Sequence, residues 1–132
     1  MDTIALLLMF TSVTNHFDLP PRLLESICYV ESNHQVHALH KDDGGTPSIG
    51  VCQVKLATAK WLGFKGDEKK LLIPSNNIYY AGKYLRYQMD RYGTAKQAVI
   101  AYNVGNAKGL TNTKYSDKVF KQWKWRKLDE RK

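Results

Sequence analysis

Hydrophobic residues recur every three or four positions along most of this chain, and that spacing predicts a mainly α-helical protein. The clearest example covers residues 76–92, whose apolar positions share one helical face: Ile78, Ala81, Leu85, Met89 and Tyr92. We expect Ser75 to cap the start of this helix and Gly93 to end it. The pattern therefore predicts one long amphipathic helix with a buried stripe.

Helix-start signals place a second helix earlier in the chain. Asp18 is a candidate N-cap for a helix that continues to Ser32, with Pro20 and Pro21 in its first turn. Further helices are expected over residues 4–15, 56–62, 95–102 and 115–128, the third of them capped by Thr94.

The polar stretch at 33–48 contains His, Asp and Gly and is expected to form a loop, followed by a short extended or β segment at 49–54. With 132 residues and no Pro/Gly/Ser linker, the chain is expected to form one mainly α, bundle-like domain over residues 1–132.

The apolar run Ile4–Phe10 has two interpretations. It has the hydrophobicity of a signal-peptide core, but no Lys or Arg precedes Arg22, Asp2 stands where a positive charge belongs, and no small-x-small cleavage site follows. We therefore expect a buried helix of the domain itself in a protein made in the cytoplasm without an export signal.

The formal net charge of +8 favours contact with polyanions, and seven basic residues lie between positions 118 and 132. A nucleic-acid-binding interpretation would rest on this charge and on the aromatic run Lys121–Arg126. Trp123 and Trp125 lie two apart and cannot share a helical face, so one of them is expected in the core. We expect no nucleic-acid partner, and a secondary contact of this basic helix (about 115–132) with an anionic membrane or cell surface.

Cys28 and Cys52 stand among apolar neighbours and are expected to be free buried thiols, although a bridge between them stays open. His34, His37 and His40 recur at threes, but without an acidic or Cys partner at fixed spacing we expect solvated histidines and no metal. No cofactor is expected.

One carboxylate stands out on the second helix. Leu24, Ile27, Cys28 and Glu31 share a face, so packing should remove water from Glu31 and raise its pKa, as a general acid requires. The alternative is a Glu that reaches solvent at the helix end. Glu25 lies about 120° away around the helix and cannot pair with Glu31.

A second carboxylate, if the chemistry needs one, would be Asp42 or Asp43, although their glycine-flanked loop favours a turn or solvated role. Two polar groups suit a sugar groove: the Gln53 amide after Gly50, and the Tyr102–Asn103 pair near a helix end. Asn-x-Gly at a helix end is also a common C-cap.

The order of these segments carries more information than any one of them. It runs Glu31-Ser32, Gly50-Val51-Cys52-Gln53, Ala101-Tyr102-Asn103-Val104-Gly105 and Tyr115-x-x-x-Val119. In this order the chain resembles the lytic transglycosylase and goose-type lysozyme superfamily over about residues 4–120. It departs from the family pattern by having Val-Cys where Leu-Met is usual, and by a longer separation between Glu31 and Gln53.

The resemblance implies a lysozyme-like fold and a role for each matching residue. Glu31 would protonate the glycosidic oxygen between N-acetylmuramic acid and N-acetylglucosamine in peptidoglycan glycan strands. Tyr115 would hydrogen-bond near Glu31 and help to position it. The remaining matches would bind substrate, Ser48 near the muramic acid substituents and the others along the sugar groove: Gln53, Tyr102 and Asn103.

Two outcomes of cleavage stay open. Lytic transglycosylases manage with a single Glu and close a 1,6-anhydro ring, whereas a hydrolase of goose type adds water, and Asp42 or Asp43 could then serve as partner. A non-catalytic peptidoglycan-binding module is the third alternative. We favour a transglycosylase, monomeric and acting as a phage endolysin on the bacterial cell wall or in the periplasm.

Overall fold

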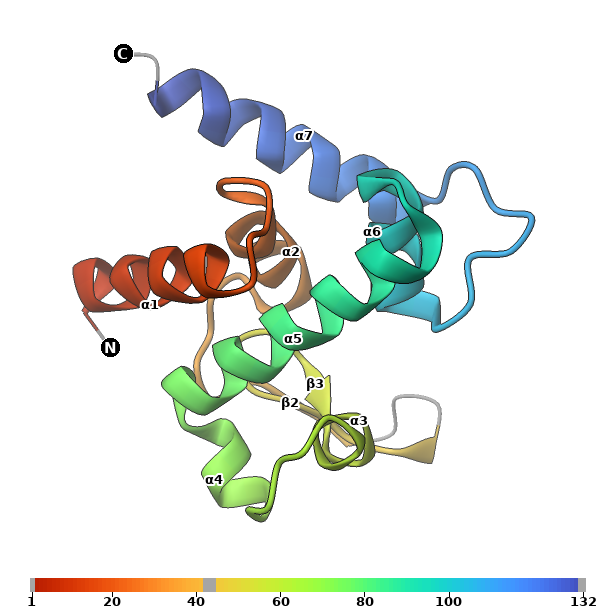
Figure 1. Cartoon of the computed structure of the whole chain (residues 1–132). Helices are drawn as coiled ribbons and strands as arrows, with labels where there is room; N and C mark the ends of the chain where they lie inside the picture. The colour runs from red at the N-terminus through yellow and green to blue at the C-terminus, as the bar shows by residue number, and fades with distance from the viewer. Residues whose placement is uncertain (1, 42–44, 131–132) are drawn as a thin grey trace.

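The computed structural model describes residues 2–41 and 45–130, with side chains up to Leu128. The helices are α1 (Thr3–His16), α2 (Leu23–Ser32), α3 (Leu56–Trp61), α4 (Glu68–Leu72), α5 (Pro74–Tyr92), α6 (Ala95–Val104) and α7 (Lys114–Glu130). Three two-residue strands, β1 (Leu39–His40), β2 (Ser48–Ile49) and β3 (Val54–Lys55), form an antiparallel sheet in that order. The mainly α fold with a short β segment is confirmed (Figure 1).

Helix α5 supplies the central surface on which the domain packs. Ile78, Ala81 and Leu85 have no exposed surface, and α1 and α6 pack against this helix. A Cβ at Gly82 would lie 2.3 Å from a Val13 methyl, so the glycine allows the close approach of α1. Gly93 ends α5 in the left-handed conformation, as predicted.

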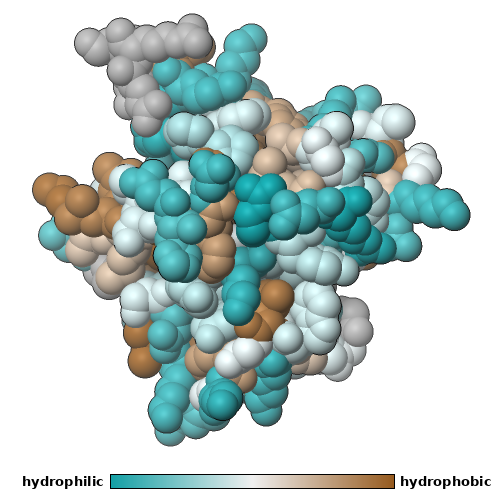
Figure 2. Space-filling view, in the orientation of Figure 1, coloured by the Kyte–Doolittle hydropathy of each residue, from teal (hydrophilic) through white to brown (hydrophobic). Residues whose placement is uncertain are grey.

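Helix α1 forms as predicted and buries Leu6, Phe10 and Val13. Its outer positions Ile4 and Leu8 stay exposed, and Figure 2 shows hydrophobic surface where α1 lies in Figure 1. Among the described residues, no helix combines the length and apolarity needed to cross a bilayer.

The start predicted for α2 is wrong. Asp18 has a φ of +52° and lies in the turn after α1, where the N–H of Leu19 donates to the carbonyl of Thr14. Helix α2 begins only at Leu23. Its N-cap residue is Arg22, which has a left-handed backbone and makes no capping hydrogen bond through its side chain. The prolines that looked like first-turn residues therefore belong to the connection between α1 and α2.

Smaller differences from the predicted elements concern short helices and caps. Helix α4 was not predicted, because five residues are too few to show a helical period; the Asp67 carboxylate caps it by accepting from the Lys70 N–H at 3.0 Å. Ser75 does not cap α5, which begins at Pro74, whereas the predicted Thr94 cap of α6 is confirmed. The segment 49–54 is not one extended piece, since a turn separates β2 from β3.

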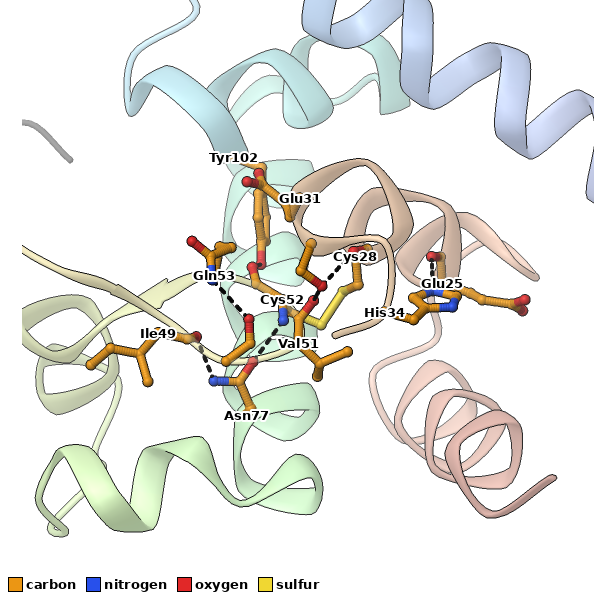
Figure 3. Close-up of a disulfide and its surroundings, with 12 residues drawn as sticks. Glu25, Cys28, Glu31, His34, Ile49, Val51, Cys52, Gln53, Asn77 and Tyr102 are labelled. Carbon is orange, nitrogen blue, oxygen red and sulfur yellow. Dashed lines mark hydrogen bonds between the residues drawn. A yellow bond between two sulfur atoms is a disulfide. The ribbon is translucent and has the colours of Figure 1, made fainter. Parts of the chain in front are cut away.

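The expectation of free thiols is wrong: Cys28 and Cys52 form a disulfide across a sequence separation of 24 residues (Figure 3). Both cysteines are fully buried. The sequence spacing carried no sign of the bridge because it depends on α2 packing against the turn between β2 and β3.

Helix α7 closes the domain by packing on α2. Trp123 is partly buried, and its indole N–H donates to the carbonyl of Pro21 at 2.8 Å, whereas Trp125 is 60% exposed. The expectation that one of the two tryptophans packs in the core is confirmed. Arg126 is buried and donates to Glu25 at 3.0 Å, which fixes the far end of α7 to the start of α2.

Candidate active site

A groove of about 280 Å³ lies at the C-terminal end of α2. Its walls come from α2, the β2–β3 region, α3, α5 and the end of α6. It brings together residues widely separated in sequence: Glu31, Ser48, Gln53, Val54, Lys55, Thr58, Tyr84, Tyr102, Asn103, Val104 and Gly105. Five of the predicted site residues are therefore in one place, while Asp42 and Asp43 lie outside the described residues.

Glu31 lies in the last turn of α2, partly buried at the groove. The hydroxyl of Tyr115, at the start of α7, donates a hydrogen bond to Glu31 Oε2 at 2.7 Å. Burial, and then the negative charge of Glu31, raises the pKa of Tyr115 well above its usual value. Tyr115 therefore stays a neutral hydrogen-bond donor to Glu31 at physiological pH.

Gln53 presents its amide to the groove from an unusual backbone position. Its φ is +55°, at the end of the turn that follows β2. The side-chain Nε2 donates to the carbonyls of Gly50 at 3.0 Å and Ala38 at 3.3 Å, and Oε1 contacts the His40 Nδ1. With several partners on one amide, Gln53 is held in one orientation before any sugar arrives.

Contacts from α2, α5 and α6 hold residues 50–53, the turn between β2 and β3, in place (Figure 3). The disulfide and a 2.6 Å bond from the Ser32 hydroxyl to the Val51 carbonyl join it to α2. The Asn77 side chain joins it to α5. Its Oδ1 accepts from the Cys52 N–H at 2.8 Å, and its Nδ2 donates to the carbonyl of Ile49, just before the turn, at 2.8 Å.

Gly50 is required where this turn meets α5. A Cβ at Gly50 would lie 2.4 Å from the Asn77 amide nitrogen, and its φ of +79° also disfavours other residues. Sequence reasoning assigned no role to Asn77, because its role depends on packing between distant segments.

Tyr102 lines the groove, and its hydroxyl is bonded within the protein. The buried hydroxyl donates to the Cys52 carbonyl at 2.8 Å. This bond joins α6 to the turn at residues 50–53. Burial, and secondarily the charge of Glu31, raises the pKa of Tyr102 well above 10, so it remains a donor.

Asn103 is exposed, and the structure places it in the groove lining. Gly105 ends α6 with φ +87°, and its N–H donates to the Ala101 carbonyl at 2.7 Å. The Asn-x-Gly segment thus supplies both a helix stop and a groove residue. Ser48 in β2 is almost fully buried and reaches the same groove.

A second hollow of about 580 Å³ lies on the other side of Glu31. Its lining includes Val30 and Asn33 at the end of α2 and two lysines of α7, Lys118 and Lys121. Glu31 borders both hollows, so it lies where a polymer passing from one to the other would cross.

Several lining residues were missed by the sequence analysis. Thr58 on α3, Tyr84 on α5 and Lys55 on β3 line the groove. Tyr84 is one position before the buried Leu85, so it turns away from the helical stripe that the pattern detected. A large aromatic residue outside the buried stripe was the signal in the sequence that Tyr84 could line a groove.

The three histidines do not gather at one site. His34 is partly buried and bonds the Glu25 carbonyl at 2.9 Å through Nε2, so the expectation of a solvated ring is wrong for His34. His40 is exposed and contacts Gln53 through Nδ1. Within 2–41 and 45–130 there is no group of three or more His, Cys, Asp or Glu side chains that could hold a metal.

Comparison with known proteins adds independent findings. Residues 9–125 match the family model of the Transglycosylase SLT domain. The chain is 29% identical over 111 residues to Protein IpgF of Shigella flexneri and of Shigella sonnei, covering 81% of this chain and 73% of the relative. It is 32% identical over 108 residues to the Transglycosylase of Enterobacteria phage PRD1, covering 80% of this chain but 38% of that relative.

Proposed function

This chain belongs to the transglycosylase SLT family and is a peptidoglycan lytic transglycosylase, and from that premise we propose that Glu31 is its catalytic acid and base. The observation that carries the proposal is the position of Glu31. It lies at the groove, it borders both hollows, and it accepts the Tyr115 hydroxyl.

Two proton transfers through Glu31 account for the reaction. The protonated carboxyl donates its proton to the β-1,4 glycosidic oxygen that joins N-acetylmuramic acid to N-acetylglucosamine, and the bond from that oxygen to C1 breaks. The carboxylate then takes the proton of the muramic acid C6 hydroxyl while its oxygen bonds to C1. The products are a 1,6-anhydromuramic end and a free N-acetylglucosamine end, and no water is consumed.

The groove supports this outcome over hydrolysis. Retaining and inverting hydrolases usually need a second carboxylate at a defined separation from the acid. Of the described residues, Glu31 is the one carboxylate in the groove lining. We propose that Gln53 and Asn103 bind sugar amide and hydroxyl groups, that the Tyr102 ring packs on a sugar face, and that Ser48 meets the muramic acid substituents.

Mass spectrometry of digested sacculi tests the proposal. We expect anhydro-ended fragments, each one water lighter than the hydrolysed equivalent, and no fragments from Glu31→Gln. The double variant Asp42→Asn/Asp43→Asn is expected to give the same anhydro products. Hydrolysed ends that disappear in the double variant would instead establish a two-carboxylate hydrolase, and sacculi that are bound but never cut by the parent chain would establish a binding module.

We further propose that residues 1–132 act as one monomeric catalytic domain in phage lysis, made in the host cytoplasm and acting on the cell wall. The similarity to a phage transglycosylase supports the phage origin. The disulfide suits an oxidising compartment such as the periplasm, where it would form after the protein leaves the cytoplasm.

The exposed lysines of α7 support a secondary contact with anionic surfaces. Sedimentation with vesicles rich in anionic lipid should show binding that weakens with salt. A variant with Lys118, Lys121 and Lys124 changed to Gln should lose it while keeping α7, whose buried Arg126 is left intact. Salt-independent binding, or binding retained by this variant, would remove the electrostatic contact.

A further inference from the structure

A cation stands in the catalytic groove together with Glu31. Of the described residues in the groove lining, Glu31 and Lys55 are the two with charged side chains, and Lys55 is half-buried. The N-acetylhexosamine rings of a glycan strand carry no charge, so the rings themselves offer no anion to an ammonium group. A lysine in this lining therefore indicates that the bound strand carries an anionic group.

The small sheet places Lys55 beside the residue that we propose meets the muramic acid substituents. Ser48 in β2 pairs directly with Lys55 in β3 and, on its other side, with His40 in β1. Residues directly opposite each other in an antiparallel sheet project from the same face, with Cβ atoms about 5 Å apart. Because Ser48 and Lys55 both line the groove, they bring a hydroxyl and an ammonium group to one of its walls.

Local structure does not account for a lysine at position 55. Lys55 is the N-cap residue of α3, and its side chain makes no capping hydrogen bond. Ser, Thr, Asp and Asn are preferred at an N-cap because their side chains accept from the first N–H groups of the helix, whereas a lysine side chain has no acceptor. A residue that breaks a local rule at the wall of a groove points to a role in function.

N-acetylmuramic acid supplies an anion through the lactyl group on its C3 oxygen. In strands without peptides the lactyl group ends in a free carboxylate, and in other strands it is joined to a peptide that carries carboxylates of its own. We propose that Lys55 determines specificity by binding a carboxylate of the muramic acid substituent, through charge-assisted hydrogen bonds from its ammonium group. This contact selects a muramic acid over an N-acetylglucosamine at this point of the groove, and so sets the register of the strand. The inference rests on the proposed function, because the strand must lie in the Glu31 groove for its substituent to reach Lys55.

Steady-state rates on four preparations of soluble strands test this contact. One pair is strands without peptides, with the lactyl carboxylate free or converted to its methylamide. The other pair is peptide-bearing strands, with the peptide carboxylates free or methylamidated. In one of these pairs, we expect the parent to show a KM about tenfold lower for the carboxylate form than for the neutral form. The pair that shows the difference identifies the source of the carboxylate, lactyl group or peptide.

Lys55→Gln should remove this preference by raising KM on the carboxylate form, while kcat stays within about twofold of the parent. Lys55→Arg should keep the preference, because it retains the positive charge. Lys60 is the matched control, since it is exposed on α3 and does not line the groove. Lys60→Gln should behave like the parent on all four preparations, and melting temperatures check that each variant is folded.

The outcomes separate this specificity from the function that it extends. Equal KM values within both pairs for the parent, or a preference that survives in Lys55→Gln, overturn the role of Lys55 while the proposed function stands. An equal loss by Lys55→Gln on all four preparations also overturns it, because Lys55 would then act on Glu31 or on the shape of the groove. Absence of cleavage by the parent on every preparation overturns both proposals.

Discussion

The two ends of α2 carry two glutamates in contrasting surroundings. Glu25, near the start, is buried between two guanidinium groups, with Arg22 Nε at 2.8 Å and Arg126 Nε at 3.0 Å. Glu31, in the last turn, borders an open groove and accepts a hydrogen bond from the neutral hydroxyl of Tyr115. The same residue type on one helix is thus a structural anion in the first place and suited to proton exchange in the second.

The surroundings of Glu25 explain why it is a structural group. Burial alone would raise the pKa of Glu25, but the hydrogen bonds and positive charges of Arg22 and Arg126 outweigh burial and hold the pKa below its usual range. A carboxyl group that is held between two cations stays ionised at neutral pH and therefore has no proton to donate. For Glu25, the charges of its partners therefore outweigh burial in deciding the protonation state.

The largest expected effect comes from Glu31→Gln. This change keeps the shape of the side chain and removes the proton that the reaction needs, so turnover of sacculi should fall at least about a hundredfold. The urea midpoint should change little, since the groove is open to solvent. Loss of fluorescently labelled fragments from sacculi measures turnover, and a variant that lyses sacculi at the parent rate would contradict the assignment of Glu31.

Glu25→Gln should show the opposite pattern. Removing the anion leaves the guanidinium of Arg126 buried without its partner, and we expect unfolding to become easier by about 3 kcal/mol. At temperatures where the variant is folded, kcat should stay close to that of the parent. Urea unfolding followed by circular dichroism gives the first quantity. A stable variant with lost turnover would reverse the roles that we assign to the two ends of α2.

The Cys28–Cys52 disulfide joins α2 to the turn that carries the groove residue Gln53. Cys28→Ala/Cys52→Ala opens a link across 24 residues, and the unfolded chain then gains entropy worth about 3 kcal/mol. Hydrogen bonds from Asn77 and Tyr102 still hold the turn, so the folded variant should keep activity with a higher KM.

Reductant should destabilise the parent chain and have no effect on the variant that lacks both cysteines. Melting curves with and without dithiothreitol make this comparison. If the two curves of the parent coincide, the bridge contributes nothing to stability.

Acid should destabilise the fold by protonating Glu25 and His34, whose ring bonds the Glu25 carbonyl. Burial lowers the pKa of His34 below 6.5, although its bond to the Glu25 carbonyl acts in the opposite direction. Folding lowers the pKa of both groups. Each group therefore stabilises the fold fully at pH values above its pKa in the unfolded chain, and this stabilisation is lost as the pH falls. Stability should therefore start to decline below about pH 6.5 through His34 and decline further below about 4.5 through Glu25.

Urea midpoints across a pH series measure this decline. Glu25→Gln should remove the lower part of it, and His34→Gln the upper part. Parallel curves for all three proteins would assign acid sensitivity to other groups.

The sequence predicted what depends on local periodicity and on ordered motifs. The long helix of α5, its stop at Gly93 and the cap at Thr94 follow from side chains that are neighbours in sequence. The disulfide and the support of the turn by Asn77 could not be predicted, because both depend on packing between segments far apart in the chain.

The start of α2 shows how a local signal can mislead. Asp18 followed by prolines has the composition of a helix start, but the buried Leu19 binds the end of α1 and pulls this segment into a turn. For the site, the motifs identified Glu31 and Gln53, whereas Tyr84 and Thr58 come from helices whose pattern reports only their buried faces.

The smallest effect that we predict tests how Glu31 is positioned. Tyr115 contacts Glu31 but is not among the residues that line either hollow beside it. Tyr115→Phe removes one hydrogen bond to a charged group and keeps the ring, so kcat should fall about tenfold, or about 1.4 kcal/mol, while KM stays within about twofold.

Tyr92→Phe is the matched control. The Tyr92 hydroxyl bonds the Asn106 side chain at 3.1 Å and receives the Ala107 N–H at 2.8 Å, away from Glu31. Its loss should lower stability by about 1 kcal/mol and leave kcat unchanged. Steady-state rates on soluble glycan strands separate kcat from KM. A Tyr115→Phe enzyme with a raised KM and an unchanged kcat would show that the hydroxyl serves substrate binding, and the orientation of Glu31 would then have to come from its own helix.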